Sequence, residues 1–188
     1  MSSLPLNPFT ITGGCFGTVI TYTLSIPSLS DRPKIPEILL KNNRNLTLDA
    51  QNEITARLPI TQLDHCNSCR RTAGAIVQCW FVFPQSWMQF SLLPKESSEP
   101  EIKRVKPQTV DVIKGDEKLL DNTYLSHFRS SEFAHRTFCG RCGTNLTFHF
   151  SGKSKVQCFE DWPPIFDVAV GSMDQESVEL EGLRPRTQ

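Results

Sequence analysis

Two short cysteine pairs constrain this chain more than any other feature. Cys66 and Cys69 form one Cys-x-x-Cys pair, and Cys139 and Cys142 form a second one that is followed by Gly143. This spacing lets a tight turn present two thiolates to one metal ion, and glycine permits the positive φ that such a turn needs. Two such pairs in one chain predict a fold organised around zinc.

Disulfide and redox interpretations of these pairs are weaker. The N-terminal residues lack the basic region and apolar run of a secretion signal, and no stretch approaches the length of a membrane helix. We therefore expect a cytoplasmic protein, or a nuclear one, in which thiols stay reduced and cysteines serve metal binding or catalysis. A redox pair of the thioredoxin type would lie in a βαβ pattern, which does not surround Cys139.

Length and charge narrow the class of partner. A chain of 188 residues suits one domain, and its 20 Lys and Arg residues balance its 20 Asp and Glu residues. A protein without net charge produces no long-range field that attracts polyanions. We expect neither nucleic acid nor a membrane as a partner.

Strand patterns dominate the apolar part of the sequence. Alternation of apolar and polar residues predicts half-buried strands at Thr18–Ile26 and Thr144–Phe150. The nearly continuous apolar run Ile76–Phe83 predicts a strand that is buried on both faces, and Trp87–Leu93 and Ile165–Val170 are shorter candidates. Helical periodicity is scarce, so the predicted class is mainly β.

Two polar segments interrupt this pattern. Residues 31–63 are rich in proline and asparagine, and residues 94–118 are rich in charge. Both are interpreted as insertions into one domain that spans residues 11–174, and residues 175–188 are interpreted as a C-terminal tail.

The first cysteine pair has two more eligible zinc donors beside it, Asp64 and His65. Zinc in proteins takes four donors, and both carboxylate and imidazole belong to its usual set. The simpler alternatives are that His65 faces solvent and that Asp64 caps the turn. For His65 the simpler alternative is preferred.

The order of motifs along the chain resembles the glutathione-dependent formaldehyde-activating enzyme family, which includes centromere protein V. The resemblance spans roughly residues 11–174. Ser130-Ser131 ahead of Arg136 adds to it. The segments that carry it are Gly13-Gly14-Cys15, His65 to Gly74, Phe138 to Thr144 and Asp167 to Asp174.

The resemblance implies an Mss4-like fold, in which small antiparallel sheets pack around zinc, and a structural zinc site. By position, its ligands here are Cys15, Cys139 and Cys142. This chain reads Cys15-Phe16-Gly17, one residue short of the family's Cys-x-Cys-Gly, so one ligand is missing. Water, Cys79 or Cys158 could supply a fourth donor. For Cys79, which lies in an apolar strand, the alternative is a small buried hydrophobic residue.

The resemblance also implies a second, catalytic zinc that leaves one coordination position open for a thiol. By position, Cys66 and Cys69 are its ligands, and Asp64 stands where the family has its first cysteine. A carboxylate oxygen is a harder donor than a thiolate and binds a soft metal less tightly. We therefore expect weaker zinc binding at this site. The chain as a whole would bind one zinc ion, or two if this site is occupied.

The implied activity is carbon–sulfur bond formation or cleavage, of the lyase type, on a thiol adduct such as S-hydroxymethylglutathione. Arg70, Arg71 and Arg141 lie near the ligands in sequence and would bind the carboxylates of such a peptide, or would lie in solvated turns. His135 and His149 could carry protons, although a lone histidine on a strand is more often structural.

Two other functions remain open at this point. The chain could be a non-catalytic zinc module that binds a protein partner, or a degenerate relative that has lost its catalytic zinc. The departures from the family pattern at the N-terminal cysteine and at Asp64 favour the zinc module over the enzyme.

Overall fold

The structure is a computed structural model that describes residues 4–36, 56–96, 103–152, 162–180 and 183. Within these residues the chain forms two antiparallel sheets. The smaller sheet has the order β1-β2-β5, with β1 at Phe9–Gly14, β2 at Ile20–Ile26 and β5 at Met88–Leu92.

The larger sheet has the order β3-β4-β9-β8-β7-β6. Its central strands β4, β9 and β8 bring together segments that are distant in sequence, and β9 joins them by pairing with both β4 and β8. The strand bounds are β3 Ile60–Asp64, β4 Gln78–Pro84, β6 Leu125–Arg129, β7 Ala134–Cys139, β8 Asn145–Phe150 and β9 Ile165–Ala169.

In the described part of the chain, four short α-helices lie at the edges and between the sheets. Gly74 and Gly115 end α2 and α3 in the left-handed conformation, with φ of 63° and 71°, which glycine adopts without strain. The helix bounds are α2 Asn67–Ala73, α3 Thr109–Lys114, α4 Glu117–Asn122 and α5 Gln175–Val178.

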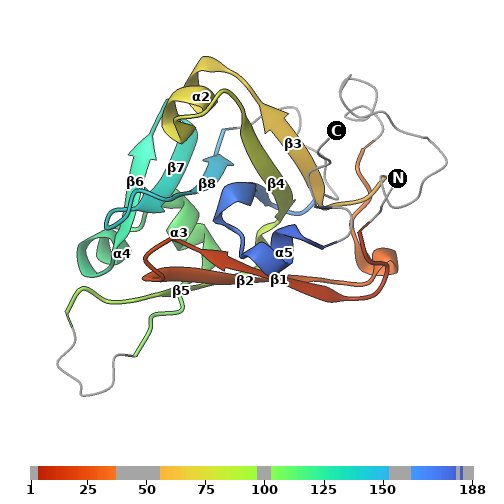
Figure 1. Ribbon diagram of the computed structural model, residues 1–188, viewed down its shortest axis with the longest axis horizontal. Coiled ribbons are helices and arrows are strands. Elements are labelled where there is room, and N and C mark those ends of the chain that lie inside the picture. The colour runs from red at the N-terminus through yellow and green to blue at the C-terminus, as the bar shows by residue number, and fades with distance from the viewer. Residues whose placement is uncertain (1–3, 37–55, 97–102, 153–161, 181–182, 184–188) are drawn as a thin grey trace.

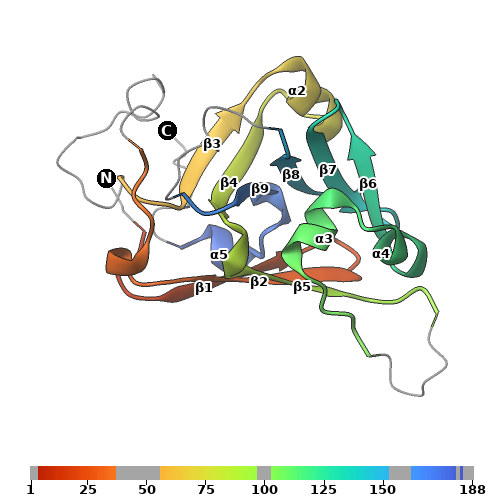
Figure 2. The same ribbon diagram turned by 180° about the vertical axis from the view of Figure 1, so that it is seen from behind.

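The core fills the space between the two sheets. The smaller sheet lies across the bottom of Figure 1 and the larger sheet rises above it. Apolar side chains from both sheets meet there, and Phe83 and Phe166 stack edge to face with ring centroids 4.9 Å apart. Figure 2 shows α3 between β5 and the part of the larger sheet formed by β7 and β8, which α3 contacts.

The mainly β class predicted from sequence is confirmed. β2, β5, β8 and β9 fall within the predicted strand segments. β4 overlaps the predicted segment Ile76–Phe83, extends one residue beyond it to Pro84, and is buried along nearly all of its length. The four short helices are not anticipated. No helix among the described residues is long and apolar enough to cross a membrane.

Two boundaries differ from the sequence interpretation. Val112 and Ile113 of α3, inside the polar segment 94–118, are fully buried in the core. Beyond residue 174, Ser177 of α5 accepts a hydrogen bond from the Thr12 backbone, and Leu183 packs in the core. The burial of these residues could not be predicted, because the segment 94–118 is rich in charge and residues 175–188 lie near the end of the sequence. The described part of residues 175–188 therefore belongs to the domain.

Candidate metal centre and thiol site

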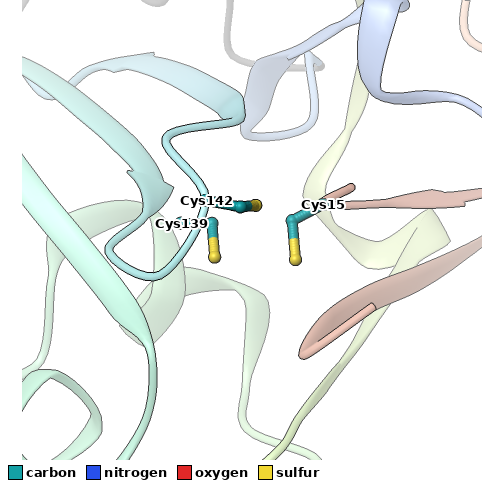
Figure 3. Close-up of side chains that lie close together, drawn as sticks. All are labelled: Cys15, Cys139 and Cys142. Carbon is teal, nitrogen blue, oxygen red and sulfur yellow. The ribbon is translucent and has the colours of Figure 1, made fainter. Parts of the chain in front are cut away.

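Three cysteines from distant parts of the chain converge between the two sheets. Cys15 follows β1, Cys139 ends β7, and Cys142 lies in the turn after β7. Their sulfur atoms all lie within 4.8 Å of one another. Figure 3 shows the three side chains close together. Among the described residues, no other group of three cysteine, histidine or acidic side chains converges in this way. We name this group the three-cysteine centre.

Backbone hydrogen bonds hold the turn that carries two of these cysteines. The Gly143 N–H donates to the Cys139 carbonyl at 2.8 Å, and the Cys139 N–H donates to the Thr144 carbonyl at 2.9 Å. Gly143 has a φ of 76°, as expected from the sequence motif. On the opposite side, the turn between β1 and β2 places Cys15, whose sulfur accepts from the Ile20 N–H at 3.4 Å.

The environment of this centre shifts the pKa values of Cys139 and Cys142 in opposite directions. Burial raises the pKa of Cys139 to about 11. Burial also acts to raise the pKa of Cys142, but hydrogen bonds from Thr144 and from the Gly17 backbone outweigh it and lower that pKa to about 6. The Thr144 hydroxyl lies 3.2 Å from the Cys142 sulfur. Cys142 is thus ready to ligate as a thiolate, and a bound cation would be needed to ionise Cys139.

The donor set and spacing fit zinc. Zinc–thiolate bonds of about 2.3 Å in a tetrahedron separate two sulfurs by about 3.8 Å, so sulfurs within 4.8 Å of one another need only small adjustments. Three soft thiolates also select zinc over hard cations. Neither cysteine considered as a fourth donor can be placed there: Cys79 does not belong to the group, and Cys158 lies outside the described residues.

Gly17 lies beside Cys142 of the three-cysteine centre. A Cβ built on Gly17 would lie 3.9 Å from the Cys142 sulfur, with no protein atom closer. The site therefore has room for a side chain at this position.

The first cysteine pair lies at the N-terminus of α2. Cys66 is exposed and caps this helix, with its sulfur accepting from the Cys69 N–H at 3.4 Å. This backbone hydrogen bond lowers the pKa of Cys66, whereas burial raises the pKa of Cys69. The Cys69 thiol donates to a carboxylate oxygen of Asp64 at 3.7 Å. We name Asp64, Cys66 and Cys69 the thiol site.

Arg136 is the main residue of this region to which the sequence assigned no role. Its side chain is only 4% exposed, and its Nη2 atom donates to the Cys69 sulfur at 3.5 Å. The guanidinium lies over the Phe148 ring, 4.7 Å from the centroid. Its Nη1 atom is buried without a hydrogen-bond partner. A buried cation beside a thiol stabilises negative charge on sulfur or on a bound anion.

Asp167 on β9 is a second such residue. It pairs in register with Phe148 on β8, which places it on the same face of the sheet as Arg136. Burial, helped by the charge of Asp64, raises the pKa of Asp167 to about 8, against the opposing effect of Arg136. Asp167 is therefore protonated at neutral pH and able to donate a proton.

A metal fits the thiol site less completely than it fits the three-cysteine centre. Cys69 lies beside Asp64, and the Cys66 and Cys69 side chains interact with each other. The ligand atoms of all three residues do not, however, lie within 4.8 Å of one another.

The other residues singled out in the sequence, Arg70, Arg71, Arg141 and His65, are exposed and do not form one group. Arg70 and Arg71 are exposed and line an open hollow of about 520 Å³ beside α2. Arg141 is exposed and lies over the Tyr124 ring at 5.5 Å. His65 is exposed, as its simpler interpretation expects. Neither the hollow nor the ring contact distinguishes peptide binding by these arginines from a solvated surface.

Three histidines are coupled across β6, β7 and β8. His127 Nε2 lies 3.0 Å from His135 Nδ1, and the His135 Nε2 atom lies 3.0 Å from the Ser151 hydroxyl. His149 pairs in register with His135, and their ring centroids are 6.0 Å apart. Burial lowers the pKa of His127 and of His135, and it lowers that of His149 to about 4.

His149 should make the protein less stable in acid. Its pKa is about 4 in the folded protein and about 6.5 in an unfolded chain, so the unfolded chain binds more protons between these values. The free energy of unfolding should therefore fall as pH decreases from about 6.5 to about 4, by on the order of 2 kcal/mol from this residue. Urea denaturation at pH 7 and pH 4.5 measures this difference in the free energy of unfolding. His149→Phe should lose less stability than the wild type over this interval, whereas the exposed His65→Gln control should not differ from it.

Comparisons with known proteins leave the chain without a family assignment on sequence similarity. No protein-family model matches it, and no curated protein matches it significantly. The three-cysteine centre and the thiol site are therefore defined by the geometry of this chain alone.

Proposed function

We propose that this chain is an Mss4-like zinc protein of the glutathione-dependent formaldehyde-activating type. It makes or breaks a carbon–sulfur bond in a thiol adduct such as S-hydroxymethylglutathione. The observation that carries this proposal is the buried cluster at the thiol site, where Cys69 contacts both Asp64 and Arg136. Strongly perturbed ionisable groups that gather around a nucleophilic sulfur are typical of active sites.

Zinc would have different roles at the two places. At the three-cysteine centre it would be structural, held by Cys15, Cys139 and Cys142. A zinc ion at the thiol site would lower the pKa of a substrate thiol. Because the three donors there do not all converge, the catalytic roles below are assigned to the side chains of the protein.

The side chains of the cluster suit both directions of the reaction. When the adduct forms, the substrate thiolate attacks the carbonyl carbon of formaldehyde, and the carbonyl oxygen takes up a proton. Arg136 stabilises the anionic sulfur, and Asp167, protonated at neutral pH, supplies that proton. In reverse, the hydroxyl proton returns to Asp167 while the carbon–sulfur electrons return to sulfur. Arg70 and Arg71 border the hollow next to this site and suit a peptide carboxylate.

Cys66→Ala should abolish this activity and leave the fold intact, because Cys66 is exposed and contributes little to the core. We expect the rate of formaldehyde consumption with glutathione to fall at least about 100-fold, within the range that one catalytic group supplies. The zinc content by elemental analysis should fall by one ion from the wild-type value. The melting temperature should fall only slightly, because the variant loses the cap of α2 but no core packing. An active Cys66→Ala protein would contradict the proposal. A loss of activity without loss of zinc would place the reaction on the thiol rather than on a metal.

A non-catalytic zinc module is the second candidate, and one observation favours it. Leu63, Ile76 and Val77 are exposed around α2, and Ile76 is 87% exposed. Exposed apolar groups of this size that lie close together are typical of protein-binding surfaces. One zinc ion in both the wild type and Cys66→Ala, with no turnover of thiol adducts by either, would favour this module over the enzyme.

A further inference from the structure

A pocket of about 340 Å³ opens at the ends of β8 and β9, away from the thiol site. On β7, Arg136 reaches the thiol site, whereas its neighbour His135 points to the other face of the sheet, because successive strand residues alternate. His149 pairs with His135 and lies on that other face. At the strand ends His149 from that face and Phe150 from the Arg136 face both line the pocket, and none of its lining residues belongs to the thiol site.

The pocket has an apolar wall and a basic side. Phe150, Trp162 and Pro163 contribute aromatic and aliphatic surface, and His149, Lys114 and Ser151 contribute polar groups. Its volume lies at the lower end of the range for small-molecule sites, which combine mostly apolar walls with a few fixed polar groups.

His149 contributes an unsatisfied polar atom. The side chain is only 7% exposed, and its Nδ1 atom is buried without a hydrogen-bond partner. Leaving such an atom unpaired costs about 1–3 kcal/mol, and buried polar groups in native proteins are nearly always paired. A ligand in the pocket that pairs with Nδ1 would recover this free energy.

The charges around the pocket are positive. Apart from burial, Lys114 is the permanent cation that acts on both His149 and His135, and Arg129 also acts on His135. Among the described residues no carboxylate contributes appreciably to either histidine. Such a surrounding favours an anion over a neutral or cationic ligand.

The polar rim of the pocket is held in place by a chain of hydrogen bonds. The Ser151 hydroxyl donates to the Phe133 carbonyl at 3.3 Å, so it accepts from His135 Nε2, and His135 Nδ1 then accepts from His127. Behind His127, Gly115 approaches so closely that a Cβ there would lie 2.4 Å from the imidazole ring. The rim is therefore ordered before any ligand arrives, which reduces the entropy cost of binding.

We propose that this pocket binds a small organic anion, an aromatic carboxylate, with its ring against Trp162 and Phe150. Its carboxylate would accept from Lys114 and from His149 in the tautomer that carries its proton on Nδ1. This site is independent of the proposed zinc chemistry, because its lining shares no residue with the three-cysteine centre or the thiol site.

Benzoate, with benzamide as its uncharged isostere, provides the test. In ¹H–¹⁵N spectra of the full-length protein, benzoate should shift the indole resonance of Trp162 with a Kd below about 1 mM. Benzamide should bind at least about tenfold more weakly, and Lys114→Met should weaken benzoate by a similar factor. Lys118→Met removes an exposed lysine from α4 that does not line the pocket, and it should bind benzoate as the wild type does.

Three results would overturn this proposal: no shift of the Trp162 resonance at 10-fold the expected Kd, equal binding of benzamide, or unchanged binding by Lys114→Met. Lys114 is exposed, so its replacement leaves the core intact, and loss of folding does not complicate the interpretation. Activity on thiol adducts plays no part in the readout, so this site and the proposed enzyme can fail separately.

Discussion

Cys139→Ala is expected to release the structural zinc and to lower the melting temperature by at least about 10 °C. The Cys139 side chain is 0% exposed and belongs both to the three-cysteine centre and to the core. Its removal leaves two thiolates, which hold zinc poorly, and opens a cavity beside Leu125 and Leu146 in the same cluster. For a domain of this size, a loss of about 4 kcal/mol or more corresponds to this shift. Differential scanning calorimetry with elemental analysis measures both effects.

The chelator-treated wild type and Cys79→Ala serve as controls. Stripping zinc from the wild type should reproduce most of the shift, because both treatments remove the same metal. Cys79 is half-buried and outside the three-cysteine centre, so Cys79→Ala should keep its zinc and lose only packing. Full zinc content in Cys139→Ala would show that the three cysteines are not the ligands.

Gly17→Cys should tighten zinc binding by at least about tenfold and raise the melting temperature of the zinc-loaded protein. The Cβ of the new residue would lie 3.9 Å from the Cys142 sulfur, with no closer protein atom to displace. A fourth thiolate would complete the tetrahedral set that structural zinc sites prefer. Competition with a chromophoric chelator gives the affinity, and the absorption spectrum of the cobalt-substituted protein reports the number of thiolates.

Gly17→Ser is the matched control, since it adds a side chain of similar size with a much poorer donor. It should leave both the affinity and the cobalt spectrum close to those of the wild type. Equal gains from Gly17→Ser and Gly17→Cys would mean that the effect comes from the backbone rather than from a new ligand.

The sequence predicts the sheet-forming segments well where hydrophobic patterns are long. β2, β4 and β8 carry apolar alternation or continuous apolar runs, and periodicity identifies them without tertiary information. α3 has only six residues, fewer than two turns, so its buried Val112 and Ile113 leave no helical period to detect. A short helix that is stabilised by packing rather than by propensity is not visible in one sequence.

The residues of the candidate sites also fall into those that the sequence predicts and those that it does not. Thiolate spacing identifies Cys139 and Cys142, and the family resemblance adds Cys15. Arg136 and Asp167 acquire their properties from strand register, because β7 and β9 place them next to Phe148 on β8. Their altered environments come from burial by segments distant in sequence, which residue type and spacing do not encode.

The position of the three-cysteine centre has a consequence for the order of assembly. Cys139 and Cys142 share one turn of the larger sheet, whereas Cys15 comes from the end of β1 in the smaller sheet. A metal ion captured first by the turn would still have to close a loop of most of the chain before it reached its third ligand, and that closure carries the larger entropy cost. Docking of the two sheets would then bring Cys15 to a metal that is already in place, so that zinc completes the fold late and joins its two halves.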